Sequence, residues 1–208
     1  MRSPRGVGRD QVLAAGARLA REAARFSAFG WMRGSSGNLS EVLSRDPLLL
    51  AVTASGLDMG ELRPTDIAVV DHAGRPVDFD GLERVRPSVE ARFHAHIAAV
   101  TGARFVFHAH SLNVVEASLR WPKGPVLRGL EMIKALGRDA HDDTLRIPVI
   151  GNSQNMAELS ALFDADREEV PAVLVSGHGG YVWGADVLQA RHRAEALDWL
   201  LSLALRLR

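Results

Sequence analysis

The stretch RFVFHAHSLN, residues 104–113, carries two histidines separated by one alanine inside an apolar run. A short run of phenylalanine and valine is typical of a buried β-strand. Successive side chains of a strand point to opposite faces, so His108 and His110 would emerge on the same face. Two imidazoles on one face can bind the same metal ion. The stretch therefore predicts a strand that carries a candidate metal site.

The same tripeptide occurs earlier, in EARFHAHIAA, residues 90–99. Here the surrounding pattern predicts a helix that Pro87 and Ser88 open, with Ser88 as its cap, and that runs to about residue 100. Side chains two positions apart on a helix point about 200° apart. His94 and His96 would then face nearly opposite directions, so we expect this copy to be structural.

The remaining pattern alternates between helical and extended periodicity, without repeats or a linker. Asp10 can cap the first helix and Gly30 can end it. We expect further helices over 112–119, 127–137, 153–163 and 185–207, and strands over 48–56, 67–71, 75–79, 145–150 and both halves of 172–184. Residues 67–79 resemble a hairpin. This mixture predicts one layered α/β domain over residues 1–208.

Composition limits the classes of function. The 208 residues include 25 Lys and Arg against 25 Asp and Glu, and no cysteine. A balanced charge argues against a nucleic-acid or anionic-membrane partner, and the lack of cysteine leaves histidine, carboxylate and water as metal ligands. The first residues lack the apolar core of a signal peptide, and no run approaches the roughly 20 apolar residues of a membrane span. We expect a soluble, cytoplasmic protein.

A third histidine, His178, follows another apolar strand in VSGHGGYVWG, residues 175–184. Glycines on both sides of this histidine permit a tight turn that exposes the imidazole. Three histidines leave one position of a zinc ion open for water or substrate, which is typical of catalytic zinc.

Three short segments have the composition of phosphate-binding loops. SSGN (35–38), TASG (53–56) and PS (87–88) offer small residues, hydroxyl groups and free backbone N–H groups. Each segment is also common in ordinary turns. Their occurrence in one chain with three candidate metal ligands favours a phosphorylated substrate.

The ordered series GSSGNLS, VTASG, RPSVEARFH, FVFHAHS and VLVSGHGGYVWG resembles the class II aldolase/adducin superfamily of zinc-dependent sugar-phosphate lyases. The resemblance implies a three-layer α/β/α fold with a central, largely antiparallel sheet, assembled as a homotetramer with active sites at subunit interfaces. It implies one Zn²⁺ per subunit, with His108, His110 and His178 as ligands. The positions that match the family's phosphate-binding residues are Gly37, Asn38, Ser55, Gly56 and Ser88.

Within the superfamily, GLEMIKALG (129–137) resembles the methylthioribulose-1-phosphate dehydratases. That subgroup acts in methionine salvage and converts 5-methylthioribulose 1-phosphate into 2,3-diketo-5-methylthiopentyl 1-phosphate. The resemblance assigns to Glu131 the role of the acid/base that takes one proton and protonates the departing hydroxyl. A solvated carboxylate paired with Lys134 is the structural alternative for Glu131.

Two alternatives remain open. Glu90, in RPSVE, occupies the place of the acid/base of the aldolase branch, which cleaves a carbon–carbon bond of a ketose 1-phosphate. A first-turn acid that the helix dipole favours is the structural alternative for Glu90. Adducin-like relatives use the fold for binding alone and lack the metal site, whereas this chain retains all three histidines. Met59 and Val89 depart from the residues common in relatives, so the phosphate contacts are expected to differ.

Overall fold

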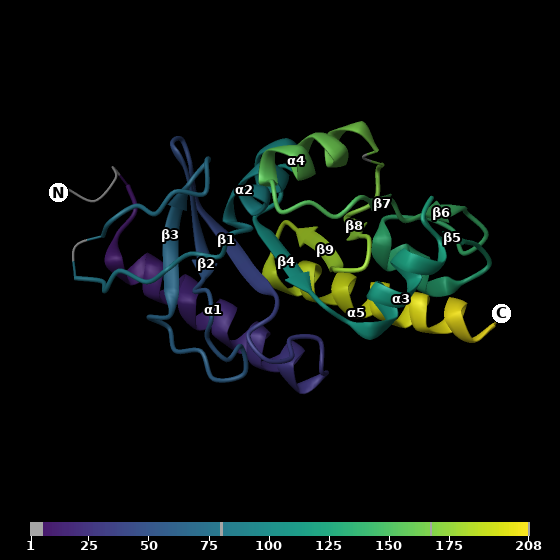
Figure 1. Cartoon of the computed structure of the whole chain (residues 1–208), viewed down its shortest axis with the longest axis horizontal. Helices are drawn as coiled ribbons and strands as arrows, with labels where there is room; N and C mark the ends of the chain where they lie inside the picture. Colours follow the sequence, from purple (N-terminus) through teal and green to yellow (C-terminus); the bar gives the residue numbers. More distant parts are fainter. Residues whose placement is uncertain (1–5, 80, 167, 208) are drawn as a thin grey trace. The chain divides into compact units, whose positions relative to one another are not determined.

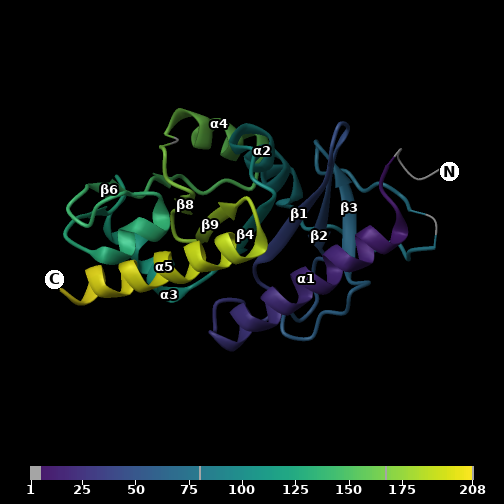
Figure 2. The same ribbon diagram turned by 180° about the vertical axis from the view of Figure 1, so that it is seen from behind.

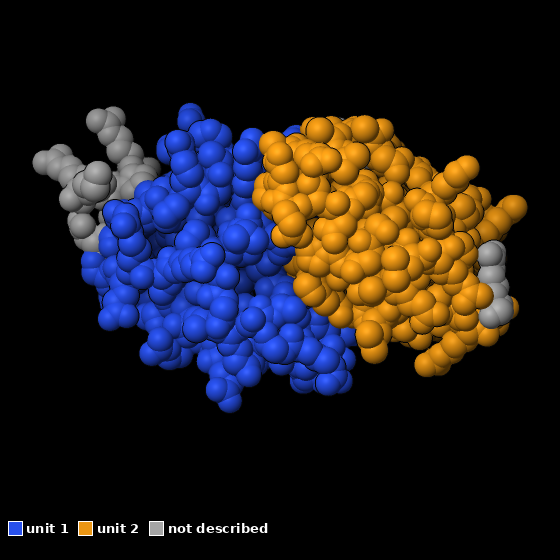
Figure 3. Space-filling view, viewed as in Figure 1, with its two compact units in different colours: residues 1–106 blue, residues 107–208 orange. Residues whose placement is uncertain are grey.

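The computed structural model describes residues 6–79, 81–166 and 168–207. The chain divides into two compact units, residues 1–106 and 107–208, which Figure 3 colours separately. The expectation of a single domain over residues 1–208 stays a prediction.

Unit 1 is an antiparallel sheet with two helices packed on it (Figure 1). Its strands have the order β3-β2-β1, and Val42 on β1 donates a hydrogen bond to the carbonyl of Arg104, just before β4. Its elements are α1 (Arg9–Ala28), β1 (Asn38–Arg45), β2 (Leu48–Thr53), β3 (Ile67–Asp71), α2 (Ala91–Thr101) and the start of β4 (Phe105–Ala109). Nearly every residue of β1 and β2 is buried, so both faces of these strands are covered. Helix α1 packs on β1 and β2, and α2 packs on β2.

Three expectations for unit 1 were wrong in detail. Helix α1 has Gly8 at its N-cap, and Asp10 lies within its first turn. Helix α2 begins at Ala91 instead of Ser88, because Pro87 pairs with Ala54 in an isolated β-bridge that keeps this segment extended. Residues 75–79 return along β3, but they contact it through short pairings and form no strand of their own.

Unit 2 has the strand order β4-β9-β8-β7. Strands β8 and β9 are antiparallel, whereas β7 and β8 are parallel. Its further elements are α3 (Leu112–Arg120), β5 (Val126–Leu127), the 3-10 helix η1 (Glu131–Leu136), β6 (Leu145–Arg146), β7 (Val149–Ile150), α4 (Met156–Ala165), β8 (Ala172–Val175), β9 (Gly179–Gly184) and α5 (Val187–Arg206). Helix α3 packs on β8 and β9, and α5 packs on β9 and along α3, which Figure 2 shows from behind.

Two expectations for unit 2 also needed correction. Only residues 131–136 of the expected helix over 127–137 are helical, and residues 126–127 form strand β5. The expected strand over 145–150 is divided in two, because Pro148 has no N–H to donate to a sheet. Strand β6 pairs with β5 in a separate two-stranded sheet, and β7 pairs with β8.

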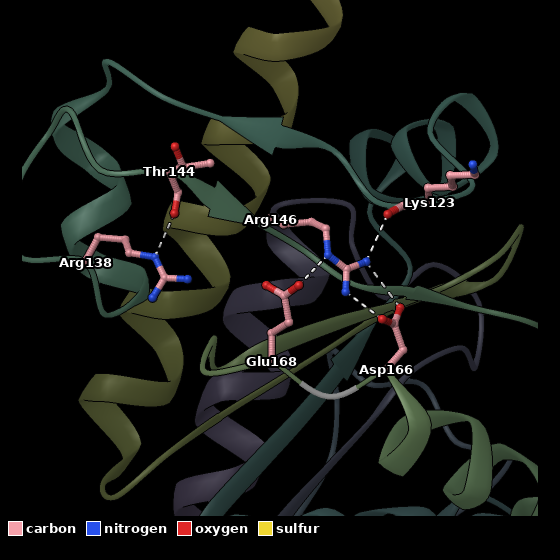
Figure 4. A network of polar contacts seen from close by, with 6 residues as sticks. All are labelled: Lys123, Arg138, Thr144, Arg146, Asp166 and Glu168. Atoms are coloured by element: carbon pink, nitrogen blue, oxygen red, sulfur yellow. Dashed lines mark hydrogen bonds and ion pairs between the residues drawn. The ribbon is translucent and has the colours of Figure 1, made fainter.

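Arg146 fixes the segment that follows α4 (Figure 4). Its guanidinium donates to Asp166 at 2.5 Å, to Glu168, and to the carbonyl of Lys123 at 3.0 Å. The hydrogen bonds that Arg146 donates to these two carboxylates raise the pKa of its guanidinium above the ordinary value. Arg138 makes a further contact in this region by donating to the carbonyl of Thr144 at 3.1 Å.

The expected fold class is confirmed. The chain has an α/β fold in which helices flank a mixed, largely antiparallel sheet. Among the described residues, no helix is both long and apolar enough to cross a membrane.

Candidate metal centre

Three histidines of unit 2 come together at one end of β4 and β9. His108 is on β4, His110 directly follows that strand, and His178 lies in the turn between β8 and β9. One ring nitrogen from each histidine can be chosen so that all three lie within 4.8 Å of one another. The Nε2 atoms of His108 and His110 are 2.8 Å apart. His108 and His110 thus point to the same side of the chain, as the period of a strand predicted, and His178 lies beside them.

The ring of His108 is held on two sides. Its Nδ1 lies 3.0 Å from the carbonyl of Gly180, and its face stacks on Tyr181 with ring centroids 4.0 Å apart. A carbonyl can only accept, so Nδ1 carries the proton and Nε2 keeps its lone pair. This is the arrangement in which a neighbouring carbonyl orients a metal-binding imidazole.

The cluster fits a metal ion with nitrogen ligands. Tetrahedral zinc with Zn–N bonds of about 2.0–2.1 Å requires ligand nitrogens roughly 3.4 Å apart. The Nε2 atoms of His108 and His110 are closer than that value, and all three ligand nitrogens lie within 4.8 Å of one another, so the rings would rotate to admit the ion. His108 is buried, whereas His110 and His178 are partly exposed, which leaves one side of the cluster open to a substrate.

Gly179 makes room for these rings. A Cβ atom at this position would lie 2.5 Å from the carbonyl oxygen of Ala109, 2.8 Å from Cδ2 of His110 and 3.1 Å from Cε1 of His108. The first two distances are shorter than those of real Cβ contacts, so with a larger residue either the backbone of the strands or the His110 ring would have to move. The glycine is required by the close approach of β9 to the ligands.

The turn that carries His178 is tight and is held by α3. The His178 N–H donates to the carbonyl of Val175 at 3.0 Å, and Gly177 has a φ of 65°, which favours glycine. The Gly177 N–H donates to Oγ of Ser118 at 3.0 Å. Ser118 lies on α3, so this helix supports the turn that presents the third ligand.

The helical copy of the tripeptide has a different environment in unit 1. His94 is fully buried on α2, and its Nδ1 lies 2.8 Å from Oγ of Ser40 on β1. His96 is two residues further along the helix and is partly exposed. Among the described residues, neither His94 nor His96 belongs to a group of three or more side chains that could hold a metal ion, whereas His108, His110 and His178 form such a group.

Glu131 lies in unit 2 on η1, but its contacts are not with the histidines. Its side chain is 75% exposed and accepts a hydrogen bond from Lys134 at 2.7 Å. That hydrogen bond holds the pKa of the Glu131 carboxyl below its ordinary value. Glu131 is therefore an ionised, accessible carboxylate at neutral pH, and its catalytic role stays a prediction.

The expected phosphate-binding residues and Glu90 lie in unit 1. Asn38 donates from Nδ2 to Oε2 of the buried Glu90 at 2.6 Å, and the Glu90 N–H donates to Oγ of Ser88 at 3.2 Å. The bridge between Ala54 and Pro87 brings the segments that carry Ser55 and Ser88 together. Gly37 and Gly56 both have positive φ angles, of 80° and 81°. The structure thus gathers these residues within unit 1, and their role in binding phosphate stays a prediction.

Several residues that support the histidines were not expected from the sequence. Tyr181 packs directly on a metal-ligand candidate, a contact that the sequence pattern did not indicate. Ser118 is an ordinary polar residue in the sequence, and nothing in its spacing indicated that it would hold the turn that carries His178. The paired glycines after His178 were a signal that a backbone passes closely, since glycine in a strand often marks such an approach.

Known proteins with similar sequences belong to one family. Residues 17–205 match the family described as class II aldolase and adducin N-terminal domain. A methylthioribulose-1-phosphate dehydratase of Bacillus pumilus is 37% identical over 182 residues, which cover 85% of each chain. A protein of the same name from a Sulfurihydrogenibium species is 35% identical over 177 residues, 84% of this chain and 81% of the relative.

A solved structure with the same fold is that of an L-fuculose 1-phosphate aldolase. It superposes with a TM-score of 0.75 and 23% sequence identity, over 91% of this chain and 84% of the aldolase. At this identity the similarity establishes the fold and does not distinguish one reaction from another.

Proposed function

The chain belongs to the class II aldolase and adducin family, and on that premise we propose that it is a methylthioribulose-1-phosphate dehydratase. The substrate would be 5-methylthioribulose 1-phosphate, and the product 2,3-diketo-5-methylthiopentyl 1-phosphate, a step of methionine salvage. The observation that carries this proposal is the 35–37% identity to proteins of that name over most of both chains. The histidine cluster supports it, because a purely binding relative would have no need of three convergent imidazoles.

We propose one Zn²⁺ per chain, held by His108, His110 and His178. A bound Zn²⁺ would polarise the carbonyl at carbon 2 of the substrate and thereby acidify the hydrogen on carbon 3. The contribution of the chain is to keep the three rings in position. The Gly180 carbonyl and the Tyr181 ring fix His108, and the turn between β8 and β9 fixes His178.

For the acid/base we propose Glu131. The dehydration requires a group that accepts the proton from carbon 3 and then donates a proton to the hydroxyl that leaves carbon 4. Glu131 is ionised at neutral pH and exposed, so it can begin as the base, and Lys134 stabilises this ionised form. Glu90 is the alternative acid/base and would accompany the aldolase reaction. Its carboxylate is buried and bound to Asn38.

For the phosphate of the substrate we propose the small residues of three loops in unit 1. Their hydroxyl groups and backbone N–H groups are the donors that a phosphate requires. These residues are Gly37, Asn38, Ser55, Gly56 and Ser88.

We also propose a cytoplasmic homotetramer with active sites at subunit interfaces. Unit 2 exposes large apolar side chains, as expected of a surface that another copy covers. They include Leu112, Leu119, Val126 and Trp199, which are 80%, 62%, 59% and 47% exposed. The exposed position of Glu131 is compatible with a site that another copy completes.

The decisive experiment tests two substrates and variants of the two candidate acid/base residues in the same assay. Zinc-loaded protein is incubated with 5-methylthioribulose 1-phosphate and, separately, with a ketose 1-phosphate, and products are followed by mass spectrometry. We expect diketone formation with the first substrate and no triose from the second. In this assay Glu131→Gln should lower kcat by about 10³-fold, as loss of an essential acid/base does, while zinc content stays unchanged.

The matched variant Glu90→Gln separates the two reactions. Under the dehydratase proposal it should retain more activity than Glu131→Gln with the methylthio substrate. Triose release that depends on Glu90 would instead establish the aldolase reaction. A protein that binds zinc but turns over neither substrate would overturn both enzyme proposals and leave a binding module.

A further inference from the structure

Ser111 directly follows His110 and occupies the N-cap position of α3. A serine at this position ordinarily accepts a hydrogen bond from a backbone N–H of the first helical turn. Here the backbone of Ser111 is extended, with φ −61° and ψ 138°, yet its side chain makes no such cap bond. Ser111 is buried, with 3% of its surface exposed, and it lies next to a metal-ligand candidate. Its hydroxyl therefore has its partner inside the protein.

The partner of this hydroxyl is Asp198 on α5. Ser111 Oγ donates to Oδ1 of Asp198, and Asn113 Nδ2 donates to both carboxylate oxygens, at 3.0 and 3.1 Å. Among the described residues, Asp198 forms no salt bridge with a basic side chain. Its carboxylate is thus devoted to the first residues of α3, immediately after His110.

Helix α3 also reaches the third histidine at its other end. Ser118 Oγ accepts a hydrogen bond from Gly177, which precedes His178, and donates to the carbonyl of Val115 at 2.7 Å. One short helix therefore connects the residue after His110 with the residue before His178. Because a helix of this length is rigid, the position of its first turn influences the spacing of both ligands.

We propose that Asp198 is a positioning residue of the metal centre. It acts through Ser111 and Asn113, which anchor α3 and the backbone of His110, and it contacts neither the metal nor the substrate. The inference rests on the proposed metal centre and adds to it a residue from the last helix of the chain. Charge-assisted hydrogen bonds are stronger than neutral ones, which suits a carboxylate for holding two donors at once.

The test measures metal affinity instead of turnover alone. Asp198→Asn keeps the shape of the side chain but removes its charge, and one of its two oxygens becomes an NH₂ group that cannot accept from Asn113 or Ser111. Loss of a residue that orients a metal ligand typically weakens metal binding by about 10- to 100-fold. We expect the Kd for Zn²⁺, measured by competition with a chromophoric chelator, to rise by at least about tenfold.

A second variant and a spectroscopic measurement test the same hydrogen-bond network independently. Ser111→Ala removes the hydroxyl without loss of a helix cap, because that hydroxyl makes no cap bond, and should weaken Zn²⁺ binding in the same direction. In the double variant the two effects should be less than additive, as for residues of one network. The visible absorption of the Co²⁺-loaded protein should change in both variants, because its intensity depends on ligand geometry.

Glu195→Gln is the matched control. It makes the same change of carboxylate to amide on α5, three residues before Asp198, and no hydrogen bond or ion pair of Glu195 is found within the described residues. Its zinc affinity and Co²⁺ spectrum should equal those of the unchanged protein. If Asp198→Asn does not fold, Ser111→Ala decides the question by itself.

Two results would count against the idea in different ways. An unchanged Zn²⁺ affinity and Co²⁺ spectrum in folded Asp198→Asn or Ser111→Ala would overturn the role of Asp198 and leave the proposed function intact. Failure of the unchanged protein to bind Zn²⁺ or Co²⁺ would overturn the metal centre itself, and the positioning role with it.

Discussion

The tripeptide His-Ala-His occurs twice, at residues 94–96 on helix α2 and at residues 108–110 at the end of strand β4. On the helix, His94 is buried against Ser40 while His96 lies two positions away on another side of the helix. At the end of the strand, the two Nε2 atoms are 2.8 Å apart and a third histidine joins them. The same tripeptide thus serves packing in one place and forms part of a candidate metal site in the other.

The difference between the two copies comes from backbone geometry. A strand returns to the same face every second residue, whereas a helix has turned by about 200° over the same interval. The two copies also differ in the residues around them. His108 has the Gly180 carbonyl and Tyr181, and the strand copy has a glycine on β9 that lets both rings approach.

The largest effect should come from removal of one histidine from each copy. His110→Ala leaves two imidazoles, too few to retain a catalytic zinc, so metal content should fall to a small fraction of one ion per chain and kcat should drop by about 10³-fold or more. His96→Ala is the matched variant from the helical copy and should keep its metal and most of its activity. Metal analysis by mass spectrometry checks both, and equal losses of metal would break the comparison.

The next effect concerns stability and belongs to the helical copy. His94→Ala removes a buried ring and one of the two hydrogen-bond partners of the fully buried Ser40, which keeps only the Val106 carbonyl at 3.4 Å. The expected cost is about 3 kcal/mol in the free energy of unfolding, from lost packing and a lost hydrogen bond. Urea unfolding followed by circular dichroism measures it. The exposed His72→Ala is the control and should change stability by less than about 0.5 kcal/mol.

For His94→Ala the metal content per folded chain should stay unchanged. That result would sharpen the comparison, because the helical copy would then affect the stability of the protein and leave its metal binding unchanged. A folded variant of normal stability that has lost its metal would show that the helical copy, too, serves the metal centre.

The fold was predictable where the hydrophobic periodicity agrees with the residues that begin and end an element. The alternation of β4, the apolar strands β8 and β9 and the long helix α5 were each expected from the sequence and are present. Errors occurred where a distant segment overrides the local pattern. Residues 87–90 resemble a helix start, but Pro87 pairs with Ala54 some thirty residues away, so the helix begins later.

The metal-ligand candidates were predictable for a similar reason, and their support was not. The relation of His108 to His110 depends only on strand geometry, which is local. The contact of Asp198 with Ser111 joins residues 87 positions apart, and no periodicity of the sequence relates them. Glu131 shows a third case. Its local pairing with Lys134 was expected as the structural alternative and is present, while its proposed chemistry depends on contacts that no spacing encodes.

The smallest effect we predict concerns the glycine that distinguishes the surroundings of the strand copy. Gly179→Ala would place a methyl group 2.5 Å from the Ala109 carbonyl and 2.8 Å from the His110 ring, so β9 or His110 must move. The backbone of Gly179 has no positive φ, so the effect is steric. We expect zinc affinity to fall by about tenfold, comparable to other disturbances of ligand orientation. Competition with a chromophoric chelator measures the affinity.

Gly151→Ala provides the control for this prediction, because its added methyl would lie 3.7 Å from Cδ1 of Leu162, an ordinary van der Waals distance. Zinc affinity should not change in that variant. If Gly179→Ala bound zinc as tightly as the unchanged protein, the close approach of β9 would not be what allows the two rings to converge. The contrast between the copies would then rest on backbone period alone.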